Sequence, residues 1–262
     1  MNKVFWFAAL VLLIDIIDTA LSPAPAPITP VSRAPEATSG HNWSYRGDTG
    51  PKFWGEIARV CQQGQQQSPI NIVSPMPAKL DEIEWDYEDK LQNIINNGHT
   101  VQVNLQPGSE IEFQDQEYQL KQVHFHTPSE NQVDGKSYPF EAHLVHANKA
   151  GQLAVVAVFF EQGEANSALT ALWQAMPMHA GEKVSLKKVK IKLDDLLPKQ
   201  RSYYHFVGSL TTPPCSEGVQ WLVMQNAISA SPQQIAAFKL ALPSTNNRPI
   251  QALNGRQVSS IQ

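Results

Sequence analysis

Three histidines stand out for their spacing, because His124 and His126 are separated by one residue and His143 follows shortly after. In an extended strand successive side chains alternate between faces, so His124 and His126 project from the same side. His143 can supply a third nitrogen from a neighbouring strand. Three histidines with one open position are the ligand set of a catalytic zinc ion. The spacing therefore predicts one Zn²⁺ per chain and a water molecule activated by it.

Two polar residues are placed to hold these rings. Gln122 shares a strand face with His124 and His126, and Glu141 shares a face with His143. A ligating imidazole usually donates its other N–H to such an oxygen, which fixes the ring orientation. The alternative is a set of ordinary core or half-exposed histidines. The concentration of half of the chain's eight histidines in this short stretch favours the metal site.

Composition is typical of a soluble globular protein with an ample core. The chain has 262 residues, of which 42% are hydrophobic and 17% are charged, and its formal net charge is -4. No stretch is basic enough to indicate nucleic-acid binding. The lysines of segment 183–192 alternate with apolar residues, which predicts a solvated strand face.

Short alternating or apolar runs dominate the folded part and predict a mainly β protein. Strands are expected over 100–105, 110–114, 118–126, 142–147, 153–160, 184–191 and 219–224. Helices are expected over 165–176 and after Ser231, where Pro232 and Gln234 complete a capping box. Tight turns are expected at Pro107-Gly108, Asp134-Gly135 and Ala150-Gly151. The expected fold is a mostly antiparallel sheet with peripheral helices.

The N-terminus differs from the rest of the chain. Lys3 precedes an uncharged run over 4–14, which is too short to span a bilayer and is typical of an export signal. Residues 1–20 are therefore predicted to be a signal peptide, although Asp15 and Asp18 leave an uncleaved anchor or an amphipathic start as alternatives.

Segment 21–40 is rich in proline and alanine and is expected to be a linker. The folded domain is then predicted to span 41–262. Two cysteines, Cys61 and Cys215, fit an exported protein, since an even count permits one disulfide in an oxidising compartment. Two unrelated buried thiols are the alternative. The expected location is exported, either periplasmic or secreted.

At several separate places the residues resemble the α-class carbonic anhydrases, in particular the bacterial exported type. The motifs that carry the resemblance are Trp43-Ser-Tyr45, Gln67-Ser-Pro-Ile-Asn-Ile72, Asn96-Asn-Gly-His99, His124-Phe-His126, Glu130, Glu141-Ala-His-Leu-Val-His146, Gly208-Ser-Leu-Thr-Thr-Pro-Pro-Cys215, Trp221 and Asn247-Arg-Pro249. The resemblance implies a large twisted, mostly antiparallel central sheet with short surface helices. It also implies a zinc ion at the bottom of a conical cleft.

The implied activity is the reversible hydration of carbon dioxide to bicarbonate and a proton by zinc-bound hydroxide. His124, His126 and His143 match the zinc ligands. Thr211 matches the residue that orients the hydroxide and donates its own hydrogen bond to Glu130, while His99 matches the proton shuttle, a task that suits imidazole.

The resemblance further implies a pocket for the neutral substrate and a polar side that orders water. The pocket positions are Val145, Val155, Leu210, Val219, Trp221 and Thr212. The polar positions are Tyr45, Asn97 and Gln102. Val145 is also placed by strand period alone, two residues beyond His143. Phe206 departs from the family, which usually has tyrosine there, so one hydroxyl near the site is missing.

Two other functions remain open at this stage. The same hydroxide could chiefly hydrolyse activated esters, but no residue obviously forms an acyl pocket. A non-catalytic binding domain of this family would have lost zinc ligands, whereas all three are present. The expected partners are carbon dioxide and bicarbonate, with no nucleic acid, no stable membrane span after processing, and a homodimer left open.

Overall fold

The computed structural model describes residues 43–261 of the chain. The predicted signal peptide and linker, and the predicted domain start at His41, lie outside these residues. Among the described residues no helix combines the length and the apolar character that a membrane crossing requires.

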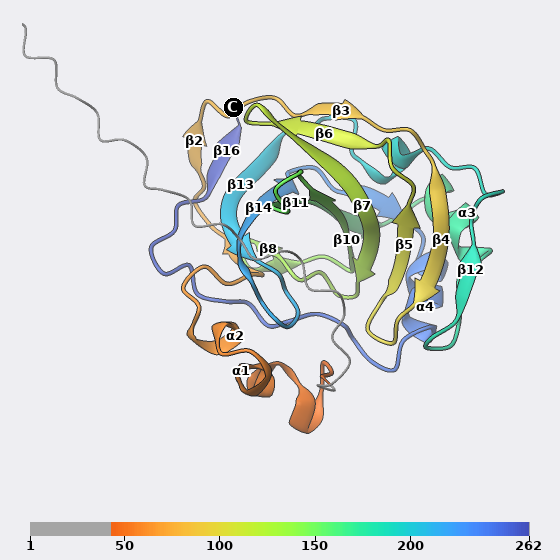
Figure 1. Ribbon diagram of the computed structural model, residues 1–262, viewed down its shortest axis with the longest axis horizontal. Helices are drawn as coiled ribbons and strands as arrows, with labels where there is room; N and C mark the ends of the chain where they lie inside the picture. Colours follow the sequence, from red (N-terminus) through yellow and green to blue (C-terminus); the bar gives the residue numbers. More distant parts are fainter. Residues whose placement is uncertain (1–42, 262) are drawn as a thin grey trace, which may run out of the picture. The chain divides into compact units, whose positions relative to one another are not determined.

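Strands are the main regular elements of the described chain (Figure 1). They are β1 (Asn71–Ile72), β2 (Met76–Ala78), β3 (Glu84–Asp86), β4 (Leu91–Asn96), β5 (Val101–Leu105), β6 (Glu110–Phe113), β7 (Gln116–His126), β8 (Gln132–Val133), β9 (Lys136–Ser137), β10 (Phe140–Ala147), β11 (Leu153–Gln162), β12 (Lys183–Ser185), β13 (Tyr203–Ser209), β14 (Glu217–Met224), β15 (Ile228–Ala230) and β16 (Ser259–Ile261).

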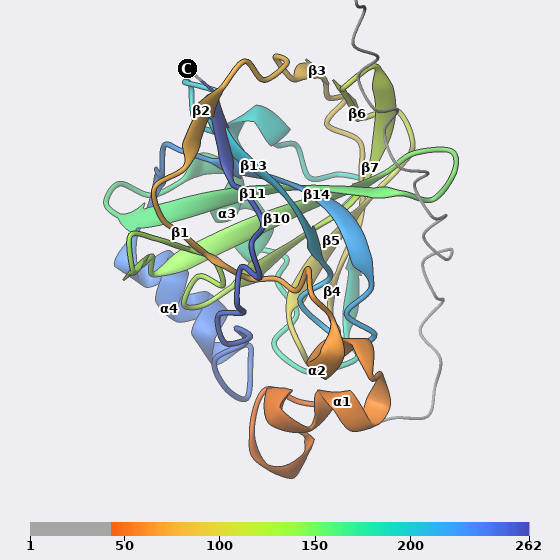
Figure 2. The same ribbon diagram turned by 90° about the vertical axis from the view of Figure 1, so that its left-hand side faces the viewer.

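The helices are short. They are η1 (Gly47–Thr49), η2 (Pro51–Phe53), α1 (Trp54–Ile57), α2 (Val60–Gln63), α3 (Ser167–Trp173), η3 (Leu193–Leu196) and α4 (Pro232–Leu240). In both ribbon views α1 and α2 lie together at one end of the described domain (Figure 1 and Figure 2).

One large twisted sheet organises the fold, in the order β12-β4-β5-β7-β10-β11-β14-β13-β16-β2. Most neighbours are antiparallel, including β7 with β10 and β10 with β11. Parallel pairs join β11 to β14 and to β15, and β16 to β2. The prediction of a mostly antiparallel central sheet with short surface helices is confirmed.

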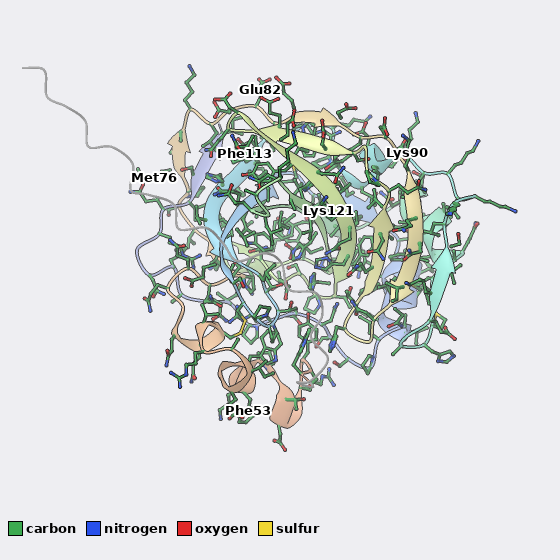
Figure 3. All side chains as sticks on the ribbon, in the orientation of Figure 1. Phe53, Met76, Glu82, Lys90, Phe113 and Lys121 are labelled. Atoms are coloured by element: carbon green, nitrogen blue, oxygen red, sulfur yellow. A yellow bond between two sulfur atoms is a disulfide. The ribbon has the colours of Figure 1, made fainter. Side chains whose placement is uncertain are left out.

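Side chains alternate between the two faces of the central strands and form a separate core on each face. On β10, Phe140 and Leu144 belong to the larger core, which includes buried residues of α3 and α4. On β11, Val155 and Phe159 belong to the smaller core on the other face, and on β10 His143 projects to that face as well. Side chains fill the space inside the curved sheet, and Phe113 is one of them (Figure 3).

Most of the predicted elements are present, with one clear error. Helix α4 starts at the predicted capping box, where the Ser231 hydroxyl accepts from the Gln234 N–H. The predicted strand over 184–191 is wrong, because β12 ends at Ser185. The Val189 N–H then bonds to the Leu186 carbonyl and turns the chain. The predicted helix over 165–176 is shorter than expected, and nine strands, among them β4 and β13, were not predicted.

A disulfide joins Cys61 of α2 to Cys215, as the even cysteine count had suggested. The bridge closes a loop with a sequence separation of 154 residues. In the chain-entropy account, a loop of this length stabilises the fold by roughly 4–5 kcal/mol by restricting the unfolded chain. Because Cys215 follows Thr211 and Thr212 closely, the bridge also anchors the loop that carries them.

His146 on β10 makes stability depend on pH in acid. The ring is fully buried, its Nε2 lies 2.8 Å from the Tyr87 hydroxyl, and burial lowers its pKa to about 3. The unfolded chain therefore binds one more proton than the folded protein between about pH 3 and about pH 6.5. We expect this contribution to be complete above pH 6.5 and to be lost progressively as the pH falls towards 3.

Urea unfolding at several pH values between 4 and 7.5 measures this effect. In this window His146 contributes up to about 1.4 kcal/mol per pH unit to the slope of the unfolding free energy against pH. His146→Gln is expected to reduce the slope of unfolding free energy against pH, whatever its effect on stability at neutral pH. The zinc-site histidines are the same in both proteins, so the difference in slope reports His146. An unchanged slope would contradict the assignment.

Candidate active site

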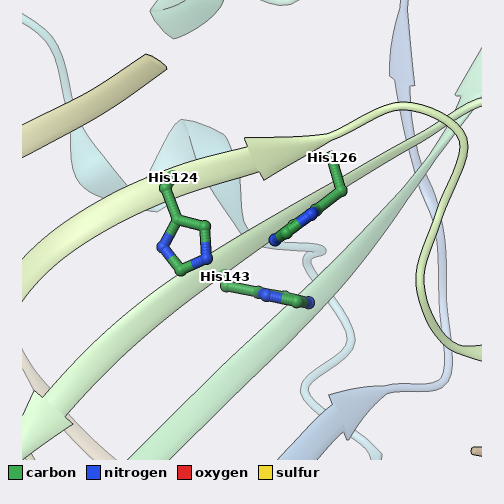
Figure 4. Close-up of side chains that lie close together, drawn as sticks. All are labelled: His124, His126 and His143. Atoms are coloured by element: carbon green, nitrogen blue, oxygen red, sulfur yellow. The ribbon is translucent and has the colours of Figure 1, made fainter. Parts of the chain in front are cut away.

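Adjacent strands β7 and β10 bring the three predicted zinc ligands together. In their antiparallel register His143 lies opposite His124, and Glu141 lies opposite His126. One nitrogen from each of the three rings lies within 4.8 Å of the others. Figure 4 shows the rings gathered around a common space. The strand alternation predicted from His124 and His126 thus places both rings on the face that His143 shares.

Each ring has one nitrogen bound to the protein. His124 Nδ1 lies 2.8 Å from Gln122 Oε1, and His143 Nε2 lies 2.9 Å from Glu141 Oε1. His126 Nδ1 lies 2.6 Å from the carbonyl oxygen of Asn246. These contacts fix the ring orientations and leave the second nitrogen of each ring for another partner.

The remaining nitrogens have the chemistry that a zinc ion requires. Nε2 of His126 is buried and has no hydrogen-bond partner among the described residues, which is costly unless something binds it. Burial, then the neighbouring histidines, lower the pKa of His124 well below its usual value, and burial lowers that of His126 and of His143. The rings are therefore neutral, as metal ligands must be. His126 and His143 are buried, while His124 is half-buried, so the group borders on solvent.

Glu141 is held firmly in its place beneath His143. Its carboxylate accepts from the backbone N–H groups of Glu130 (2.6 Å) and Asn131 (3.0 Å). The Asn131 side chain donates to it as well, at 2.8 Å. Burial raises the pKa of Glu141 to about 7, and the hydrogen bonds from Asn131 lower it. The residue can thus accept the His143 N–H without moving.

Glu130 lies at the edge of the same space. Its Oε2 is 3.5 Å from His126 Nε2 and 3.9 Å from His143 Nδ1, and its Oε1 accepts the Arg248 N–H at 2.8 Å. Burial raises the pKa of Glu130 to about 8, while the Arg248 N–H and the Thr211 hydroxyl lower it. A cation bound to the histidines would favour the ionised carboxylate.

The loop that carries Thr211 is fixed from both sides. The Leu210 N–H bonds to the Ser216 carbonyl at 2.9 Å, and the Cys215 N–H bonds to the Thr212 carbonyl at 2.8 Å. Thr211 is buried, and its hydroxyl lowers the pKa of the Glu130 carboxyl. Oε2 of Glu130 forms no hydrogen bond with a described residue. Thr211 therefore lies close to Glu130, and the hydrogen bond between them stays a prediction. Thr212, the next residue, is half-buried.

The predicted apolar positions gather next to His143. Val155 and Val219 belong to the smaller core, and Val145 and Leu210 pack against it half-buried. The Trp221 ring in that core lies edge-on to the His143 ring, with 5.0 Å between centroids. The Phe206 ring stacks on the Trp221 ring with 6.0 Å between centroids. A tyrosine at this position would add a hydroxyl that needs a hydrogen-bond partner there. An apolar wall thus adjoins the histidines.

The predicted polar residues lie on other segments of the chain than the ligands. Gln102 on β5 is paired with His124 on β7, and its amide donates to Asn104 at 2.6 Å. Asn97 is exposed, and its Oδ1 accepts the N–H groups of His99 and Thr100, which shapes the turn between β4 and β5. Burial, then the Glu130 carboxylate, raise the pKa of Tyr45 well above its usual value, so its hydroxyl stays neutral.

His99 sits at this turn, half-buried. Its ring stacks on Trp43 with centroids 3.7 Å apart and an interplanar angle of 8°. Burial lowers the pKa of His99 below its usual value. The imidazole is therefore neutral at physiological pH and able to accept a proton.

Two asparagines of the site were not predicted. Asn246 holds His126 through its carbonyl, and its side chain donates to the carbonyls of Phe125 (2.8 Å) and His99 (3.1 Å). It thereby ties the turn that carries His99 to strand β7. Asn131 holds Glu141. The only signals available were their positions directly before Asn247-Arg-Pro249 and directly after Glu130.

The fold and the site together define a mainly β protein with a three-histidine centre of the catalytic zinc type. A family model described as "Eukaryotic-type carbonic anhydrase" matches residues 49–262. The chain belongs to this family, the α-class carbonic anhydrases, whose members use zinc to hydrate carbon dioxide reversibly.

Relatives and solved structures agree with this assignment. A carbonic anhydrase of Pectobacterium carotovorum is 43% identical over 223 residues, covering 84% of this chain and 91% of that protein. One of Neisseria gonorrhoeae is 44% identical over 221 residues, covering 83% and 87%. The solved α-carbonic anhydrase of Thermovibrio ammonificans, in complex with sulfanilamide, is 40% identical with a TM-score of 0.82. It covers 85% of this chain and 100% of its own.

Proposed function

We propose that His124, His126 and His143 hold the zinc ion through the nitrogens that are not bound to Gln122, Asn246 and Glu141. The observation that supports this best is the buried Nε2 of His126, which lacks a partner among the described residues and faces two other free ring nitrogens. Bound zinc supplies a Lewis acid that lowers the pKa of a coordinated water to about 7, a value known for carbonic anhydrase. Carbon dioxide hydration measured before and after chelation, and after zinc is restored, tests the proposal.

Thr211 and Glu130 are proposed to orient the oxygen nucleophile. A hydroxyl has one donor and two acceptor sites, so Thr211 can donate to Glu130 and still accept a hydrogen bond from the nucleophile. That acceptance aims an oxygen lone pair at the carbon of the substrate. The fixed loop and the hydrogen bond from Arg248 to Glu130 support this role, since neither group has to reorganise during reaction.

The apolar wall is proposed to hold carbon dioxide before attack. The substrate carries no net charge or dipole, so dispersion and exclusion of water suit it better than hydrogen bonds. Val145, Val155, Val219 and Trp221 offer this surface beside His143. The product bicarbonate is charged and is held poorly by the same wall, which favours its release.

His99 is proposed to carry protons from the site to the solvent. Each hydration releases one proton, and an imidazole nitrogen of His99 accepts it and passes it to buffer. The half-buried position in a turn and the tie through Asn246 support this role. Tyr45, Asn97 and Gln102 are proposed to order the water molecules that lie between.

Replacing His99 by alanine is expected to lower kcat by about tenfold to a hundredfold in weak buffer. The ratio kcat/KM should change little, because proton export follows the chemical step. In the unsubstituted protein kcat should rise with pH through an apparent pKa below 6.5, since burial lowers that of His99 and only its neutral form accepts a proton.

Stopped-flow hydration in dilute buffer with and without added imidazole measures this. Imidazole should restore kcat in the alanine variant. His179→Ala is the matched control, because the His179 side chain is exposed and its ring forms no hydrogen bond with the described residues. Undiminished turnover in weak buffer, or failure of imidazole to restore it, would show that protons leave by another route.

The protein is proposed to act outside the cytoplasm, in the periplasm or the extracellular space. The disulfide between Cys61 and Cys215 supports this, since such bridges persist in oxidising compartments. The signal-like residues 1–20, the linker 21–40 and a catalytic domain from residue 41 belong to the same proposal. Fractionation of the producing cells, with N-terminal sequencing of the mature protein, tests it.

A further inference from the structure

A concentrated positive charge lies far along the chain from every residue of the zinc site. Residues 183–192, named here the lysine segment, contain five lysines and no acidic residue. The whole chain carries a formal charge of -4, so the segment accounts for +5 and all other residues for -4 - 5 = -9. A quarter of the 20 lysines and arginines thus lie in ten consecutive residues of an acidic protein. Such a local reversal of charge indicates a surface for an anionic partner.

The segment is held in place by its apolar residues. Leu186 and Ile191 are buried in the larger core, as is Leu193 just beyond the segment. The Leu186 N–H bonds to the Gln92 carbonyl at 3.1 Å, and the Leu193 N–H bonds to Asp89 Oδ1 at 2.7 Å. The backbone that carries the lysines is therefore ordered before any partner binds, which reduces the entropic cost of binding.

The lysines themselves are free to meet a partner. Each of the five is exposed, and none forms an ion pair with another described residue. The nearest carboxylates in the chain have other partners. Asp194 pairs with Arg201 at 2.9 Å, Asp195 accepts the Ser167 hydroxyl at 2.7 Å, and Glu182 accepts the His179 N–H at 3.1 Å. No described carboxylate therefore lies within ion-pair distance of these lysines.

Protection of a sheet edge does not explain the lysines. Strand β12 lies at the end of the sheet order, and a lysine on an edge strand discourages pairing with another chain. That explanation covers Lys183, which lies in β12. The other four lysines follow Ser185, where the strand has ended and no backbone edge remains to be protected.

Exposed apolar side chains accompany the charge. Val184 within the segment is 39% exposed, and Met178, five residues before Lys183, is 43% exposed. Lysines beside exposed apolar groups suit the boundary between lipid headgroups and acyl chains, where both are satisfied. We infer that the lysine segment binds the anionic headgroups of a membrane surface and docks the enzyme there peripherally. This inference is independent of the zinc site.

Co-sedimentation of the full chain with lipid vesicles tests the inference. Vesicles of phosphatidylcholine with about 30% phosphatidylglycerol are compared with pure phosphatidylcholine, at about 0.1 M and about 0.5 M salt. We expect at least about tenfold stronger binding to the anionic vesicles at low salt, and loss of the difference at high salt. The N-terminal run and Lys3 are the same in the unsubstituted protein and in the two variants below, so the comparison of the variants excludes their contribution.

Two matched variants locate the binding surface. Lys187→Gln, Lys188→Gln, Lys190→Gln and Lys192→Gln together should weaken binding to anionic vesicles more than about tenfold. The control replaces the exposed Lys52, Lys79, Lys121 and Lys239 by glutamine, which removes the same charge elsewhere, and should retain most of the binding. Both variants should hydrate carbon dioxide normally, which shows that they are folded.

Three outcomes would overturn the inference. The first is equal binding of the unsubstituted protein to both vesicle types. The second is equal loss of binding in the two variants, which would indicate net charge rather than this surface. The third is complete competition by soluble polyphosphate at the same phosphate concentration, which would indicate a soluble polyanion as the partner.

Discussion

Replacement of His126 by alanine is expected to reduce carbon dioxide hydration by more than about a thousandfold. His126 is buried, Asn246 holds one of its ring nitrogens, and the other is buried without a partner among the described residues. Without the ring, two histidines remain, and two ligands hold zinc weakly. The loss of activity should therefore accompany a loss of metal.

The measurement is zinc content after dialysis against metal-free buffer, together with stopped-flow hydration. The unsubstituted protein should retain about one zinc per chain, and the variant well below that. His179→Ala is the matched control and should retain both zinc and activity, because its ring is exposed on a loop. A variant that keeps full activity at low zinc content would contradict the proposed site.

Three residues hold the rings of the ligands. Gln122, Glu141 and Asn246 each engage one ligand, but in different ways. Two use side chains that a substitution can remove, whereas Asn246 uses its backbone carbonyl. A substitution at Asn246 therefore leaves the contact to His126 possible and acts through the side-chain amide that ties Phe125 and His99. The site depends on backbone geometry as much as on side-chain identity.

The ligand set could be predicted from the sequence because it rests on local geometry. Alternation along one strand places His124 and His126 together, and the same period places Glu141 with His143. The asparagines could not be predicted in this way. Asn246 is 120 residues from the His126 ring that it holds, and only the tertiary fold brings them together. Contacts of that separation leave no periodic signal in one sequence.

The incorrect strand over 184–191 has a similar cause. Lysines and apolar residues alternate there well enough to suggest a half-buried strand, yet two adjacent lysines, Lys187 and Lys188, interrupt the period. The chain instead turns after Leu186. The buried side chains of Leu186 and Ile191 anchor an irregular segment. The alternation in the sequence therefore predicts which residues are buried better than it predicts a strand.

Replacement of Thr211 by valine is expected to lower kcat/KM for hydration by about a hundredfold while zinc content stays unchanged. Valine matches threonine in shape but can neither donate to Glu130 nor accept from the nucleophile. The variant keeps the loop contacts of Leu210 and Cys215, which are made by the backbone. Hydration kinetics, zinc analysis and urea unfolding are measured on the same preparations.

Thr211→Ser distinguishes orientation from packing. Serine restores the hydroxyl and removes only the methyl group, so activity should return to within about tenfold of the unsubstituted value. If Thr211→Val keeps its activity while Thr211→Ser loses it, the methyl group matters and the hydroxyl does not, which would contradict the proposed role. Glu130→Gln should act in the same direction as Thr211→Val, because an amide can donate to the threonine oxygen and reverse the hydrogen bond. Combining Glu130→Gln with Thr211→Val should then cost little more than either change alone, since each breaks the same chain from Arg248 through Glu130 to Thr211.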